Sequence, residues 1–146
     1  MKHLLIAIVF LVSTAALADG WNGKWTGEGM VSSSAHGTLQ CPEVLFETAQ
    51  TDTELTVHMK KVCGDGEGQV THEHTATFVV AHGTLSNADG KVVGTITDNT
   101  IHVSEVGSES SHNCIAVMTG AHVKLESSHT HGHNAGHFSA FLTAAE

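Results

Sequence analysis

Turn signals at short, regular intervals constrain this chain more than any other feature of its sequence. Glycine, asparagine, aspartate and serine gather about every ten residues, and no long helical period appears before the C-terminal segment. Residues 98–99 (Asp-Asn) are of the kind that tolerates positive φ in a two-residue hairpin turn, and residues 87–90 form another turn signal. Many short segments joined by short turns are typical of an all-β barrel or sandwich.

The segment 23–31 favours the barrel. Its odd positions include Trp25, Gly27, Gly29 and Val31, whereas its even positions are mostly polar. Because successive strand side chains point to opposite faces, the odd positions form the inner face. Glycines on that face let the strand bend sharply, as a small barrel requires. We therefore expect a single antiparallel, up-and-down β-barrel of about eight strands, with a β-sandwich as the alternative.

The expected strands carry their own face assignments. Ile115, Val117 and Val123 share one face of the seventh strand, which places Cys114 outward or near a strand end. Pro42, the single proline, marks an edge or a bulge. The last segment fits a strand or one helical face, and we assign it as a strand. The eight expected strands span residues 24–34, 38–48, 54–63, 69–81, 91–97, 100–106, 113–125 and 137–143.

The first eighteen residues have the pattern of a signal peptide. Lys2 supplies a positive start, residues 4–12 are an unbroken apolar run, and small residues precede a cleavage site after Ala18. The apolar run is too short to span a bilayer, so we expect no membrane insertion. The sequence thus predicts a signal peptide over 1–18, one β-barrel domain over 19–146, and a secreted or periplasmic location.

The charge of the chain limits the classes of partner that it is expected to bind. The formal net charge is −9 with histidines neutral, and the chain has no arginine. An acidic chain of this kind is a poor candidate for binding nucleic acid, and it lacks the bidentate guanidinium fork. A small molecule or a metal ion is the expected partner.

Cysteine spacing predicts one disulfide. A hairpin centred on Asp52 places Cys41 opposite Cys63, and it also places Leu45 opposite Met59. Export makes the bond plausible, and closing such a loop is worth roughly 3 kcal/mol in the chain-entropy account.

The opening motif resembles two families of β-barrel proteins. Gly23 and Trp25 form the G-x-W start of lipocalin-like (calycin) barrels, and Gly27 and Gly29 extend it to the G-x-W-x-G-x-G start of nitrobindin-like haem barrels. The first resemblance implies a small apolar ligand inside a barrel whose base Trp25 seals. The second implies a haem-ligating histidine late in the chain, for which His137 is the nearest candidate by position. We hold haem as a minor hypothesis.

A pair of histidines at alternate strand positions is the sharpest chemical signal. His72 and His74 lie on the same face as Phe78, which we expect to point inward. The pair forms either part of a metal site or, as we favour, a hydrogen-bonded polar patch near the barrel mouth. We predict Trp25, Phe78, His72 and His74 as ligand-binding residues, and we expect Trp21, which precedes the strand, to be more exposed than Trp25.

A second histidine cluster lies before the last expected strand. His129, His131, His133 and His137 fall within nine residues that also contain glycine, and we expect a flexible loop there. Several imidazoles in such a loop bind borderline ions such as Zn or Cu, either physiologically or as an adventitious tag-like site.

No enzyme signature is present in the sequence. The G-x-S-x-G elbow, the phosphate loop, H-E-x-x-H and C-x-x-C are all missing, and Cys114 is a single thiol that we expect to be free and unreactive. The sequence therefore predicts an exported barrel, not an enzyme, that binds a small ligand. The alternatives are a histidine-rich protein that sequesters Zn or Cu, and a structural or interaction protein with a filled barrel.

Overall fold

The computed structural model describes residues 20–146, so the predicted signal peptide lies outside the described residues. Each strand pairs with its neighbours in sequence, and the first also pairs with the last, which closes the sheet into an antiparallel up-and-down barrel. No helix in this part of the chain is long and apolar enough to cross a membrane. The elements are β1 (Gly23–Ser33), β2 (Gly37–Gln50), β3 (Glu54–Cys63), the 3₁₀ turn η1 (Gly66–Gly68), β4 (Val70–Ala81), β5 (Thr84–Ser86), β6 (Val92–Ile96), β7 (Thr100–Val106), β8 (Ser110–Thr119), β9 (His122–His131) and β10 (Asn134–Ala144).

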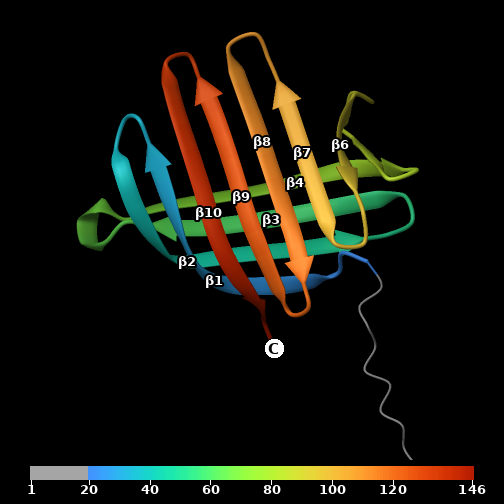
Figure 1. Cartoon of the computed structure of the whole chain (residues 1–146), viewed down its shortest axis with the longest axis horizontal. Coiled ribbons are helices and arrows are strands. Elements are labelled where there is room, and N and C mark those ends of the chain that lie inside the picture. The colour runs from blue at the N-terminus through green and yellow to red at the C-terminus, as the bar shows by residue number, and fades with distance from the viewer. Residues whose placement is uncertain (1–19) are drawn as a thin grey trace, which may run out of the picture.

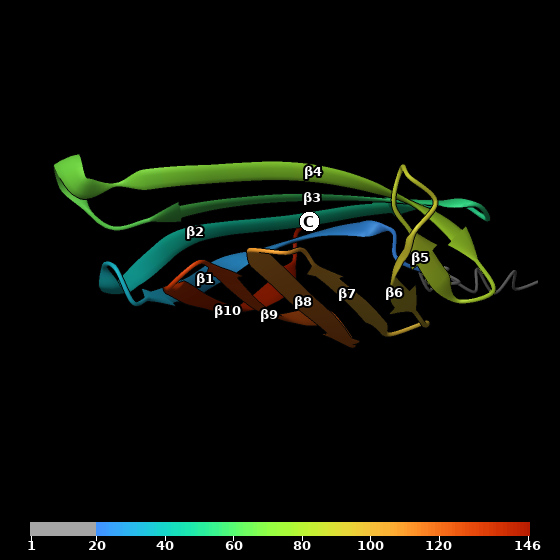
Figure 2. The same ribbon diagram turned by 90° about the horizontal axis from the view of Figure 1, so that it is seen from above.

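The barrel is flattened into two layers. Strands β2 to β4 form one layer and β7 to β10 form the other, and the strands of one layer run across those of the other (Figures 1 and 2). The buried side chains of both layers meet in a single hydrophobic core between them. The predicted barrel is confirmed, with ten strands instead of about eight.

One turn that the sequence analysis missed accounts for an extra strand. Residues 113–125 form parts of two strands, β8 and β9, joined by a tight turn in which Gly120 has a φ of 60°. Across this turn Ala116 pairs with Leu125, so even positions face inward on β8 and odd positions on β9. The prediction that Ile115 faces inward and Cys114 outward is therefore wrong. The other extra strand, β5, has three residues and is too short for its pattern to be read.

The β2–β3 hairpin contains the predicted disulfide between Cys41 and Cys63. Away from that bond, Leu45 pairs with Lys60 and not with Met59. The shift arises beside Pro42, where three steps along β2 match two steps along β1, so β2 has a bulge. The proline lacks the N–H that a regular ladder uses, and the bulge accommodates it.

Three aromatic side chains close one end of the barrel. Trp21, Trp25 and Phe46 pack with ring centroids 5.9 to 6.4 Å apart, and all three are buried. The Trp21 Nε1–H donates a hydrogen bond to the carbonyl of Thr97 at 2.9 Å, and its backbone N–H donates to Oε1 of Gln50 at 2.8 Å. Trp25 is buried as predicted, but the prediction for Trp21 is wrong because this side chain folds under the end of the barrel.

Candidate functional site

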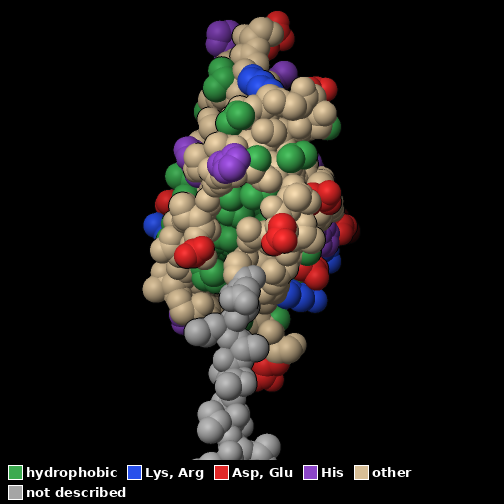
Figure 3. All heavy atoms as spheres, turned by 90° about the vertical axis from the view of Figure 1, so that its right-hand side faces the viewer, with side chains coloured by type: hydrophobic (Ala, Val, Ile, Leu, Met, Phe, Trp, Pro, Cys, Tyr) green, Lys and Arg blue, Asp and Glu red, His purple; other side chains and the backbone are tan. Residues whose placement is uncertain are grey.

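The barrel wall is open on one side. Strand β4 pairs with β5 only through its last three residues, Val79 to Ala81, so residues 70–78 have no strand on that edge. Across the gap, β7 pairs with β6 only as far as Val103. On the side of the molecule that carries β6, Figure 3 shows hydrophobic side chains in a hollow, with acidic side chains and a histidine around it. The opening exposes the interior between the two layers.

A cavity of about 320 Å³ lies at this opening. Its volume is at the lower end of the range for small-molecule sites. Strands from both layers line it, together with Asn87 from the turn after β5. Its apolar lining comprises Phe46, Val57, Met59, Ala76, Phe78, Ile101, Val103 and Ala116, and its polar lining comprises His74, Thr77, Asn87, Glu105, His112 and Cys114.

The two kinds of side chain are segregated along the cavity. Phe46 belongs to the aromatic cluster at the closed end, and Ile101 stands at the start of β7 close to that end. Glu105 and His112 are paired on β7 and β8, away from the closed end. The same two residues also line a more polar hollow of about 480 Å³ beside the β7–β8 and β9–β10 turns. A small molecule in this site therefore meets an apolar floor and a polar entrance.

Lys61 lies inside the barrel beside this polar entrance. It occupies the inward face of β3, two residues after Met59, and its Nζ lies 4.5 Å from the centroid of the Phe138 ring on β10. Burial lowers the pKa of Lys61, and the nearby thiol of Cys114 opposes that shift. Burial also raises the pKa of Cys114, so this side chain is a neutral thiol near neutral pH. Lys61 therefore places an amine in the interior, beside a neutral thiol.

Imidazoles surround the same entrance. Burial lowers the pKa of His112, and the nearby His129 and His74 lower it further, whereas Glu105 raises it. His129 packs against Gly136, where a Cβ atom would overlap its ring. The absence of a side chain at this position of β10 makes room for an inward imidazole.

The predicted ligand-binding residues have separate positions in the fold. Phe78 and His74 line the cavity as expected. His72 is paired with Lys61 on the inward face of β4, just outside the cavity lining. Trp25 is part of the aromatic cluster at the closed end and does not reach the cavity, because Phe46 lies between them.

The predicted metal-binding loop is a hairpin. His129 and His131 end β9, His133 lies in the turn, and His137 is on β10. His129 and His131 line the polar hollow, whereas His137 lies on the outer face beside the β1–β2 turn and so faces away from the barrel interior that a haem would occupy. The four imidazoles do not converge, and no three His, Cys, Asp or Glu side chains within residues 20–146 are close enough to hold one metal ion.

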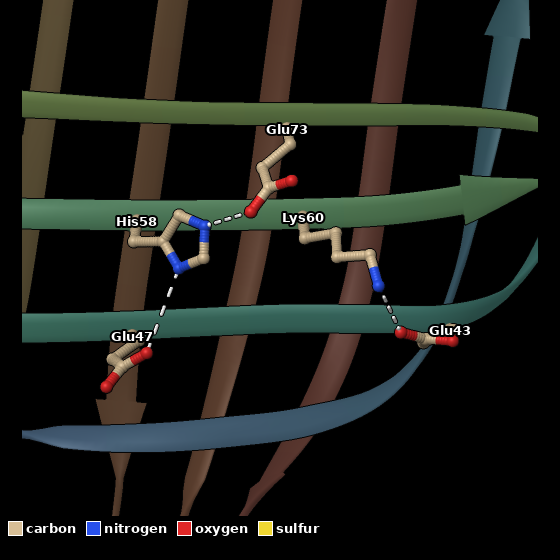
Figure 4. A network of polar contacts seen from close by, with 5 residues as sticks. All are labelled: Glu43, Glu47, His58, Lys60 and Glu73. Atoms are coloured by element: carbon tan, nitrogen blue, oxygen red, sulfur yellow. Dashed lines mark hydrogen bonds and ion pairs between the residues drawn. The ribbon is translucent and has the colours of Figure 1, made fainter.

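The outer face of β2 to β4 has a different electrostatic character. His58 lies between two carboxylates, with its Nε2 2.8 Å from Oε1 of Glu73 and its Nδ1 3.8 Å from Oε2 of Glu47 (Figure 4). Lys60 pairs with Glu43 at 3.0 Å. On this face the charged groups are matched with one another, which is the usual arrangement of a solvated surface.

Sequence reasoning missed four residues at the entrance: Lys61, Glu105, His112 and Cys114. The signal for Lys61 was present, because it interrupts the apolar face that begins at Leu55. The signal for Cys114 was hidden by the unrecognised turn at residue 120. A scan against protein-family models finds no match to this chain, and a search of curated proteins finds no significant match.

Proposed function

We propose that this protein binds a small, largely apolar molecule inside its barrel and does not catalyse a reaction. The observation that supports the proposal best is the cavity between β4 and β7, with its apolar floor and its polar entrance. Most small-molecule sites have this composition, in which apolar side chains supply affinity and a few polar groups fix orientation. The closed aromatic end opposite the entrance would limit how far a ligand enters.

Two further observations agree with an exported carrier of this kind. The Cys41–Cys63 disulfide is typical of an oxidising compartment outside the cytoplasm. The resemblance of residues 23–29 to the start of lipocalin-like barrels points to the same class of ligand. The separation of the histidines gives no comparable support to metal sequestration within the described residues.

Titration with N-phenyl-1-naphthylamine, a neutral apolar dye that fluoresces in apolar surroundings, tests the proposal. Ala76→Phe fills the cavity from β4, whereas Thr75→Phe adds the same ring at the next position, on the outer face. We expect the wild type and the Thr75 variant to bind the dye at one site and the Ala76 variant to bind it at least about tenfold more weakly. Equal binding by all three proteins, or by none of them, would contradict an interior site.

A further inference from the structure

Lys61 is an inward-facing lysine without a carboxylate partner. The neighbouring Lys60 points outward to Glu43, and Lys124 on β9 lies 3.3 Å from Glu126. Within residues 20–146 no carboxylate oxygen lies within 4.0 Å of the Lys61 ammonium group. Its Nζ lies over the face of the Phe138 ring, and Cys114 and His112 are near enough to interact with it electrostatically. A cation over an aromatic ring is attracted to it, but the ring does not neutralise the charge.

The groups around Lys61 leave its charge uncompensated. Cys114 is an acidic side chain close to it, and burial raises the pKa of this thiol, so it stays neutral near neutral pH. Glu105 is the one carboxylate in the described lining of the cavity; it is the strand neighbour of His112, and its oxygens do not lie within 4.0 Å of the Lys61 amine. Burial lowers the pKa of Lys61, and an anion bound beside the amine would favour its charged form. The interior therefore holds a lysine to which the described chain offers no carboxylate partner within 4.0 Å.

An uncompensated interior charge reduces the stability of a fold. Moving an ammonium group out of water is unfavourable, and an apolar side chain of similar length at such a site is often neutral or stabilising. Groups held in this way beside a cavity are candidates for ligand binding. The position of Lys61 fits that role, because Met59 on its own strand and Cys114 across the barrel both line the cavity.

The same entrance offers hydrogen-bond donors to an anion. His74 and His112 line the cavity on facing strands, and an imidazole N–H can donate to a carboxylate oxygen. Beyond them the lining is apolar down to Phe46. The overall charge of −9 disfavours approach by a polyanion, and a single negative head group experiences the least repulsion.

We infer that the ligand of this barrel is a small amphipathic monoanion, with a carboxylate-type head group bound at Lys61 and an apolar body in the cavity. The inference rests on the proposed function and names the chemical class of its ligand. The ammonium group and the imidazoles at the entrance fix the orientation of the ligand, with its head toward the polar hollow and its body toward the aromatic end.

Calorimetric titration with three ten-carbon probes tests the inference. Decanoate, decanol and decyltrimethylammonium share an alkyl chain and differ in head-group charge. We expect the wild type to bind decanoate about 10 to 100 times more tightly than decanol, since a hydrogen bond to a charged group is worth about 1.5–3 kcal/mol, and to bind the cation most weakly. Lys61→Met should bring decanoate to the affinity of decanol and leave decanol unchanged. The matched control, Lys60→Met, should keep the preference.

The outcomes separate this inference from the proposed function. If the wild type binds decanoate and decanol equally, or if Lys61→Met keeps the preference for decanoate, the anion site is refuted while binding of the neutral dye can still stand. If neither the dye nor any probe binds, both proposals fail. A thermal melt of each variant checks folding, and we expect Lys61→Met to melt at or above the wild-type temperature. If Lys61→Met does not fold, Lys61→Gln takes its place in the titration.

Discussion

Replacement of Trp21 by alanine should destabilise the barrel as strongly as loss of a central core residue. Trp21 is 0% exposed, although it precedes β1, and its ring packs edge-on against Trp25 and Phe46. Truncation of a buried tryptophan costs about 3–5 kcal/mol. The carbonyl of Thr97 also loses its hydrogen-bond donor, for which about 1–3 kcal/mol is usual when the acceptor stays buried. These contributions overlap, so we expect a total of about 4–6 kcal/mol.

Thermal unfolding followed by circular dichroism measures this effect. For a domain of this size, each kcal/mol shifts Tm by about 3–4 °C, so Trp21→Ala should lower Tm by about 12–24 °C. Trp21→Phe keeps most of the packing and loses the hydrogen bond, so its Tm should fall by about 3–12 °C. Phe141→Ala is the matched control, because this ring is 62% exposed and packs on His122 at the surface. A Tm for Trp21→Ala within about 3 °C of that control would refute the account of the closed end.

Three other predictions concern the sheet, the disulfide and the interior histidines. Gly94→Ala should destabilise the fold by about 1–3 kcal/mol, because the new Cβ would overlap the backbone carbonyl of His102. In the control Gly68→Ala the new Cβ meets no atom within 4 Å, so chemical denaturation should show little change in its stability. Replacing both Cys41 and Cys63 by alanine should lower the free energy of unfolding by roughly 3 kcal/mol, and an unchanged denaturation midpoint would refute this. Because the pKa of His112 is lowered in the folded state, the unfolded chain takes up this proton first as the pH falls. The stability is therefore fully present above the ordinary histidine pKa of about 6.5 and decreases as the pH drops toward the lowered value. His112→Gln should make this decrease shallower between about pH 7 and pH 5, and a pH profile of stability identical to that of the wild type would contradict the prediction.

The barrel itself could be predicted because its signals are local. The glycines that follow Trp25 on one face of β1, the two-residue turn at residues 98–99 and the Cys41–Cys63 pairing depend on short stretches of sequence. The order of neighbouring strands then follows from short turns alone. The register failed beside Pro42, because a bulge shifts the pairing of every residue beyond it and leaves no distinct pattern in the strand.

The candidate site was harder to predict because it depends on which face each strand turns inward. An unrecognised turn at Gly120 reversed the faces of β8, so Cys114 and His112 were not placed inside. The opening in the barrel wall exists because β5 is short, and a strand of three residues is too short for its side-chain pattern to be recognised in the sequence. Trp21 was misplaced for a related reason: it packs on Phe46 and hydrogen-bonds to Gln50 and Thr97, which are all distant in sequence.

The alkylation rate of Cys114 tests the central claim, that a small molecule enters the barrel interior, most directly. Cys114 is the free cysteine of the described chain, and it lines the cavity. Iodoacetamide labelling followed by intact mass spectrometry measures the rate with and without saturating N-phenyl-1-naphthylamine. We predict that the dye slows alkylation at least about tenfold in the wild type, since a bound ring covers the thiol, and has no effect in Ala76→Phe. An alkylation rate that the saturating dye leaves unchanged in the wild type would contradict binding in this cavity.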